Sequence, residues 1–180
     1  MNLTGYQYRT TETLSESLLP IGCDAWTAYV GLQLVSETGE ILGKFAKWVR
    51  DDGGDLRDVT GMDPGLADAI MHEVGDLLYF LAQVGVDAGW EMHVEPLLTS
   101  VDLEEVLVFL TQSTSAMHLY LMHEGYSREA LKQDWNMALS LTAKIASMMG
   151  YTLYEVALMN QNKLASRQIR GKISGSGDRR

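Results

Sequence analysis

Two short acidic segments constrain this chain more than any other feature of its sequence. Residues 37–40 read ETGE and residues 73–76 read EVGD, so both follow the pattern E-x-G-[ED] within stretches of helical periodicity. Because residues i and i+3 share one face of a helix, each segment points two carboxylates in the same direction. The glycine between the two acids removes a side chain, which allows a ligand to approach the helix closely.

Four carboxylates on two neighbouring helices would repel one another unless a cation lay between them. Hard oxygen ligands of this kind suit Mg²⁺, and also Mn²⁺. The segments are therefore predicted to form a divalent-metal site rather than two solvated helix faces, although Glu and Asp are usually exposed. The candidate metal ligands, which are also the candidate catalytic residues, are Glu37, Glu40, Glu73 and Asp76.

The composition favours one all-α domain that spans residues 1–180. The chain is 46% apolar with only three prolines, it is rich in Leu, Ala, Met and Glu, and it has few alternating β-branched runs. Its net charge of −10 argues against nucleic-acid binding. A single cysteine, no visible signal peptide and no apolar run long enough to span a bilayer lead us to expect a cytoplasmic protein without a membrane partner.

Hydrophobic periodicity and capping residues predict a bundle of six helices. Asp24 is expected to cap the second helix, whereas Asp63-Pro64 begins the third and Gly89 ends it. The glycine-rich stretch between the second and third helices is predicted to be a loop that separates the two acidic segments. The six helices are expected at about residues 4–17, 25–50, 64–88, 101–124, 128–149 and 152–168.

The helical pair at about 100–149 aligns with the pair at 25–88 as an altered copy. The alignment lays Leu110 on Leu34 in the first helix of each pair, and Gly150 on Gly89 after the second. Two unrelated amphipathic pairs align to a similar degree, so duplication and coincidence both stay open. The alignment replaces Glu37, Glu40, Glu73 and Asp76 by Ser113, Ala116, Asp134 and Met137. One acidic site per chain is therefore expected.

Basic residues gather in two places that can serve an anionic ligand. From Lys163 to Arg180 there are six Lys or Arg and one Asp, which is either a solvated tail or a source of cations for that ligand. Lys44, Lys47 and Arg50 lie in the last turns of the second helix, where they either compensate the helix dipole or bind phosphate.

Three segments together resemble the all-α nucleoside triphosphate pyrophosphohydrolase superfamily, the MazG-like proteins. The family's ExxE and ExxD motifs match GLQLVSETGEI at 31–41 and HEVGDLLYFL at 72–81, and its closing N-x-x-K-L-x-x-R…G-x-G-D-x-R segment matches residues 160–180. Tyr6-Gln7 also matches a recurring N-terminal feature. The resemblance covers about residues 5–92 and 150–180. A longer gap between the motifs and an inserted helical pair at about 93–149 depart from it.

The resemblance implies hydrolysis of a nucleoside triphosphate between the α and β phosphorus atoms, with Mg²⁺ held by the four carboxylates, in a homo-oligomer for which we favour a dimer. A dUTPase- or dCTPase-like enzyme with narrow base choice and a non-catalytic helical interaction protein are the alternatives. Trp48 and Phe80 are candidates to stack on the base, although Trp48 also suits a core position. The candidate substrate-binding residues are Lys44, Lys47, Trp48, Phe80, Asn160, Lys163 and Arg167.

Overall fold

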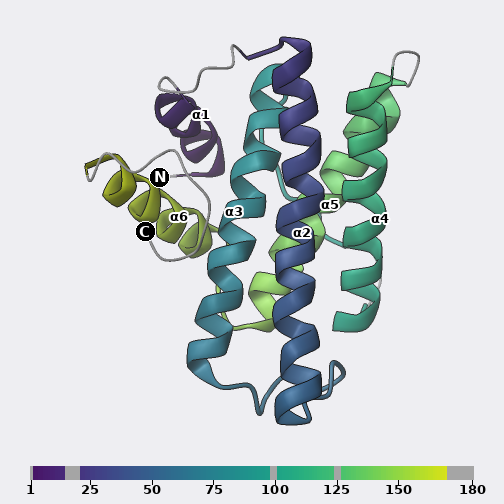
Figure 1. The fold of residues 1–180 in the computed structure, drawn as a ribbon, viewed down its shortest axis with the longest axis vertical. Coiled ribbons are helices and arrows are strands. Elements are labelled where there is room, and N and C mark those ends of the chain that lie inside the picture. The colour runs from purple at the N-terminus through teal and green to yellow at the C-terminus, as the bar shows by residue number, and fades with distance from the viewer. Residues whose placement is uncertain (1, 15–20, 98–100, 124–126, 170–180) are drawn as a thin grey trace.

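The computed structural model describes residues 2–14, 21–97, 101–123 and 127–169, and these residues form α-helices without any β-sheet (Figure 1). The all-α prediction is therefore confirmed. The basic residues beyond 169 lie outside the described part of the chain. The helices are α1 (Leu3–Leu14), α2 (Asp24–Asp52), α3 (Pro64–Ala88), α4 (Leu103–Met122), α5 (Arg128–Met148) and α6 (Leu153–Ile169).

Local capping explains why these helices begin and end where they do. Wherever a predicted helix end falls on a described residue, it agrees with the structure to within two residues. Asp63 caps α3 by accepting hydrogen bonds from the next turn, and Gly89 ends α3 with a positive φ of 68°. The prediction for α2 is wrong in one detail, because Cys23 is its N-cap and Asp24 is its first residue. At that position the carboxylate of Asp24 complements the helix dipole.

Four helices form a bundle, and two more cover one side of it. In Figure 1, α2 lies between α3 and α4, and α5 lies behind them. The α4–α5 pair thus packs against the α2–α3 pair, with α2 against α4 and α3 against α5. Helices α1 and α6 pack against each other and against α3, on the side away from α4.

The central element is α3, which α1, α2, α5 and α6 all contact. Its side chains are buried on nearly every face, which agrees with its continuous apolar sequence. Two polar contacts fix it further: the indole of Trp135 donates a hydrogen bond to the Leu81 carbonyl at 2.7 Å, and Gln7 bonds backbone atoms of Trp90 and Met92 just beyond its end. None of the helices in the described residues is both long and apolar enough to cross a bilayer.

Candidate metal-binding site

The crossing of α2 and α3 brings three of the four predicted carboxylates together. One oxygen from each of Glu37, Glu73 and Asp76 lies within 4.8 Å of the others. Glu73 is buried, with 5% of its surface exposed, whereas Glu37 and Asp76 are half-buried. Three hard oxygen donors at this spacing can hold a metal ion.

Glu40 differs from the other three carboxylates. It is exposed and lies outside the group, although it is close enough to Glu37 to act on that carboxyl electrostatically. The sequence pattern predicted that both acids of each segment would face the same ligand. In α2 only the first of the two does so in this structure.

Burial and repulsion change the acidity of Glu37. Burial is the largest cause, and the charges of Asp76, Glu40 and Glu73 add to it, so the pKa of Glu37 rises from 4.5 to about 8. The ammonium group of Lys163 opposes this rise. Without a cation Glu37 therefore keeps its proton near neutral pH, and an ion bound there would have to displace that proton.

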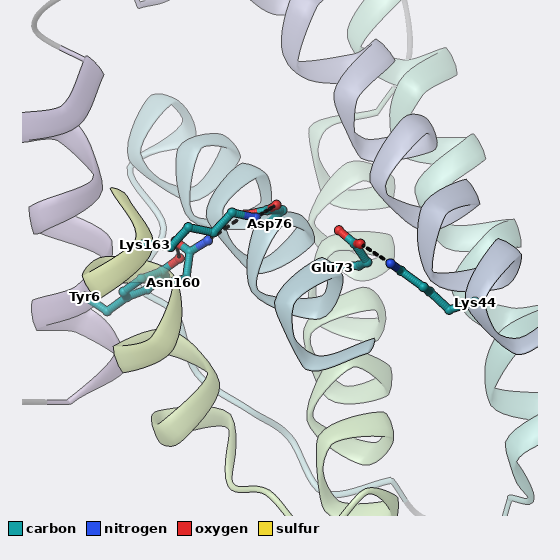
Figure 2. A network of polar contacts seen from close by, with 6 residues as sticks. All are labelled: Tyr6, Lys44, Glu73, Asp76, Asn160 and Lys163. Atoms are coloured by element: carbon teal, nitrogen blue, oxygen red, sulfur yellow. Dashed lines mark hydrogen bonds and ion pairs between the residues drawn. The ribbon is translucent and has the colours of Figure 1, made fainter. Parts of the chain in front are cut away.

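Two lysines pair with the other two carboxylates (Figure 2). Lys44 Nζ, from α2, lies 3.1 Å from Glu73 Oε1. Lys163 Nζ, from α6, forms an ion pair with Asp76 Oδ2. All four side chains are mostly buried, so each carboxylate has a partner that compensates its cost of burial. Both lysines were predicted to bind substrate, and the structure brings both to the carboxylate group.

A buried hydrogen-bond chain orients Asp76. The hydroxyl of Tyr6 donates to Asn160 Oδ1 at 2.9 Å, and Asn160 Nδ2 donates to Asp76 Oδ1, also at 2.9 Å (Figure 2). Burial raises the pKa of Tyr6 well above its usual value, so this phenol stays protonated and remains a donor. The chain ties α1 and α6 to the carboxylate on α3.

The two glycines of the acidic segments have different surroundings. A Cβ on Gly75 would lie 3.1 Å from the Cβ of Asn160, so this glycine lets α6 approach α3 closely. A Cβ on Gly39 would meet nothing within 4 Å. The sequence-based interpretation, in which both glycines admit a ligand, is therefore wrong for Gly75, whose space is taken by Asn160.

The remaining predicted site residues lie farther from the carboxylates. Trp48 is buried in the core with Gly54 against its ring, which is the alternative role considered for it. Phe80 lies one turn beyond Asp76 on α3 and contacts Tyr29 and Tyr79 edge-on. Lys47 is exposed and Arg167 is half-buried. Within the described residues, no ion pair joins either of these two cations to the carboxylates.

Sequence reasoning assigned no role to Tyr6 and Tyr29. Tyr6 is 154 residues from Asn160 in the chain, so no local pattern could connect them. Tyr29 lies two turns before Glu37 on α2, a spacing that places both on one helix face, and this signal could have been found.

Searches for related proteins identified none: no family model matches the chain, and no significant match was found among curated proteins or solved structures.

Proposed function

We propose that this protein is a Mg²⁺-dependent nucleoside triphosphate pyrophosphohydrolase of the MazG-like all-α type. It would hydrolyse a ribo- or deoxyribonucleoside triphosphate to the monophosphate and pyrophosphate. The observation that carries this proposal is the convergence of Glu37, Glu73 and Asp76, with Lys44 and Lys163 paired to two of them.

The donor set fits a hard divalent cation. Glu37, Glu73 and Asp76 would hold it, and Glu40, which lies outside this group, would add negative charge nearby. Mg²⁺ held there would supply a positive charge for phosphate and would activate water. Mn²⁺ has the same ligand preference and is expected to substitute.

The two lysines would change partners when a cation and a triphosphate bind. Lys44 and Lys163 would be released from Glu73 and Asp76 if a bound cation neutralised these carboxylates. Both groups then lie beside the carboxylates, where they can pair with phosphate oxygens. The chain's high negative charge would otherwise repel such a substrate.

Two side chains would keep Asp76 and the reacting water in place. Tyr6 holds Asn160 Oδ1, so the amide nitrogen of Asn160 must face Asp76 and keep its carboxylate oriented. One of the two carboxylates on α2, Glu37 or Glu40, would accept a proton from water once the cation is bound. Phe80 is buried, so its edge-on neighbours Tyr29 and Tyr79 would supply the aromatic surface for a nucleobase.

Assembly into a homodimer is supported by apolar surface on α2 and α4. A cavity of about 690 Å³ between these helices is lined largely by Leu42, Phe45, Val49, Leu107 and Val108. Val108 is half exposed, so a polar substitution there should not disturb the core. We expect Val108→Asp to convert a dimer to a monomer in light scattering after size exclusion, and a wild-type monomer would contradict this assembly.

Pyrophosphate release decides the proposed function. Purified protein is incubated with each common NTP and dNTP, with Mg²⁺ or with a chelator, and products are separated by anion exchange. We expect monophosphate and pyrophosphate from at least one substrate, with Mg²⁺ only. Release of orthophosphate instead would show cleavage at the wrong bond, and the absence of any product across the panel would refute the proposal.

A further inference from the structure

The two helix pairs meet at residues that the sequence alignment makes equivalent. The hydroxyl oxygens of Thr38 on α2 and Thr114 on α4 lie 3.1 Å apart in the core. The alignment that lays Leu110 on Leu34 also lays Thr114 on Thr38. Each threonine hydroxyl bonds the carbonyl of its own leucine, at 2.7 Å for Thr38 and 2.9 Å for Thr114.

Contact between equivalent residues is what an approximate two-fold axis requires. Residues on such an axis touch their own counterparts, whereas residues away from it touch other partners. Such an axis between Thr38 and Thr114 would relate the α2–α3 pair to the α4–α5 pair and would account for this contact. The equivalences came from sequence and the contact from structure, so the two observations are independent.

Rotation about this axis would place the carboxylate site over a second cavity, of about 880 Å³, which is lined by α4, α5 and residues 95–97 and 101. The alignment replaces the four acids by two residues on α4 and two on α5. All four replacements line this one cavity: Ser113, Ala116, Asp134 and Met137. The cavity is the counterpart of the carboxylate site in the second helix pair.

The residues at the replaced positions are not suited to bind a metal ion or a phosphate group. Only Asp134 remains of the four acids, which is too few oxygen ligands for Mg²⁺. Lys44 is replaced by Tyr120, which also lines the cavity. Of the described residues around it, none is Lys or Arg, and Asp134 and Glu95 are the acids. A phosphate would therefore meet negative charge without a cation to pair with.

The lining suits an uncharged heterocycle. The volume lies within the range of small-molecule sites. The ring of Phe109 offers a stacking surface, and several amides and hydroxyls offer both donors and acceptors. The polar groups that could read the edge of a base are Gln112, Ser113, Tyr120, Gln133, Asn136 and Ser140.

We propose that this cavity binds an uncharged nucleoside without a metal ion. The choice of a nucleoside over other heterocycles rests on the proposed function, because the cavity is the counterpart of a site assigned to nucleotides. The exclusion of phosphate and metal rests only on the residues that line the cavity. The protein would thus carry one site for a nucleoside triphosphate and one for a nucleoside.

The test is binding of the five common nucleosides and their monophosphates in the presence of chelator, by titration calorimetry. We expect at least one nucleoside to bind, and its monophosphate to bind at least about tenfold more weakly. The position of the bound nucleoside is read from the ¹³C-methyl resonance of Met137, which is assigned by its absence in Met137→Leu. This resonance should shift when the nucleoside is added. Failure of every nucleoside to bind would overturn the proposal.

Matched tryptophan variants place the ligand. Ala116→Trp fills the cavity and should weaken binding at least about tenfold, whereas Ala25→Trp, at the exposed start of α2, should leave it unchanged. If circular dichroism shows that Ala116→Trp does not fold, the Met137 resonance of the wild-type protein still shows whether the nucleoside binds in the cavity. A nucleoside that leaves Met137 unshifted, or whose binding is lost in Glu37→Gln, would occupy the carboxylate site and refute the inference.

The two proposals fail separately. Pyrophosphate release without nucleoside binding would refute the second site and leave the proposed function intact. A nucleoside that shifts Met137 in a protein that releases no pyrophosphate would refute the proposed function and leave the second site intact.

Discussion

On the α2–α3 side of the bundle, Glu37, Glu73 and Asp76 approach to within 4.8 Å of one another. On the α4–α5 side, the residues at the matching positions are Ser113, Asp134 and Met137, and they line an open cavity. The backbone arrangement is similar in the two pairs, with two packed helices that meet about the Thr38–Thr114 contact. The side chains therefore decide the chemistry of each side.

The difference follows from the helices that surround each pair. Helix α6 packs on α3, where Lys163 and Asn160 compensate and orient Asp76. Gly75 makes this approach possible, because any side chain there would press on Asn160. The alignment places Asn136 opposite Gly75 in α5, which would obstruct an equivalent helix. The carboxylate group therefore lies where neighbouring helices can compensate its burial.

Removal of one carboxylate should have the largest effect. Glu73→Gln keeps the shape of the side chain but removes the charge of a proposed metal ligand, so we expect kcat for pyrophosphate release to fall at least about a thousandfold. The matched control is Asp68→Asn, an exposed acid on the same helix, which should leave kcat within about twofold. Activity of Glu73→Gln within tenfold of wild type, with Mg²⁺ binding intact by calorimetry, would refute the metal assignment.

Removal of the Lys163 charge should lower kcat/KM for the nucleotide but raise the affinity for Mg²⁺. Lys163→Met removes a phosphate partner, which should lower kcat/KM by about 10- to 100-fold. It also frees Asp76 from its ion pair, so Mg²⁺ without nucleotide should bind more tightly. Lys132→Met, an exposed change on α5, should alter neither quantity. If Mg²⁺ binding weakened together with kcat/KM, the exchange of partners would be wrong.

The helices were predictable because their signals are local. The cap and proline at Asp63-Pro64 and the glycine after α3 lie within a few residues of the ends they set. The i, i+3 spacing of acids likewise predicted the convergence of Glu37, Glu73 and Asp76. Spacing along a helix does not say how the helix is rotated about its axis. For that reason it could not separate Glu37, which faces α3, from Glu40, which is exposed.

Lys44, Asn160 and Lys163 were named as site candidates, but their contacts with the carboxylates were not predictable, because these contacts depend on tertiary packing. The chain from Tyr6 through Asn160 to Asp76 joins three helices that are distant in the sequence. Trp48 fitted both a core role and a stacking role until its packing against Gly54 was seen. The alignment of the two pairs stays a prediction, with which the contact of Thr38 with Thr114 agrees.

The raised pKa of Glu37 predicts a pH dependence that only the carboxylate side should show. A carboxyl whose pKa folding raises from 4.5 to about 8 holds its proton more tightly in the folded state. Its contribution to stability is therefore complete below about pH 4.5 and is lost as the pH rises through about 8. We expect the free energy of unfolding of the metal-free protein to decline over that range relative to Glu37→Gln, measured by urea unfolding with chelator.

The affinity for Mg²⁺ should rise with pH, whereas the free energy of unfolding should fall. Because the proton of Glu37 must leave before the ion binds, affinity for Mg²⁺ should rise with pH until about pH 8 and then level off. The exposed acids Asp51, Asp55 and Asp58 have lowered pKa values, so they titrate below this window. Parallel unfolding curves for wild type and Glu37→Gln between pH 5 and 9 would show that Glu37 ionises normally.

The smallest effect is expected at the axis between the two pairs. Thr38→Val or Thr114→Val each leaves one buried hydroxyl without its partner across the interface, at a cost of about 1 kcal/mol. The double variant removes both hydroxyls, so it should be less destabilised than the sum of the singles by about 0.5–1 kcal/mol in urea unfolding. Thr142 provides the control, because its buried hydroxyl bonds the Ala138 carbonyl of its own helix. Thr38→Val combined with Thr142→Val should be additive. Equal additivity in both pairs would mean that α2 and α4 meet at the axis through packing alone.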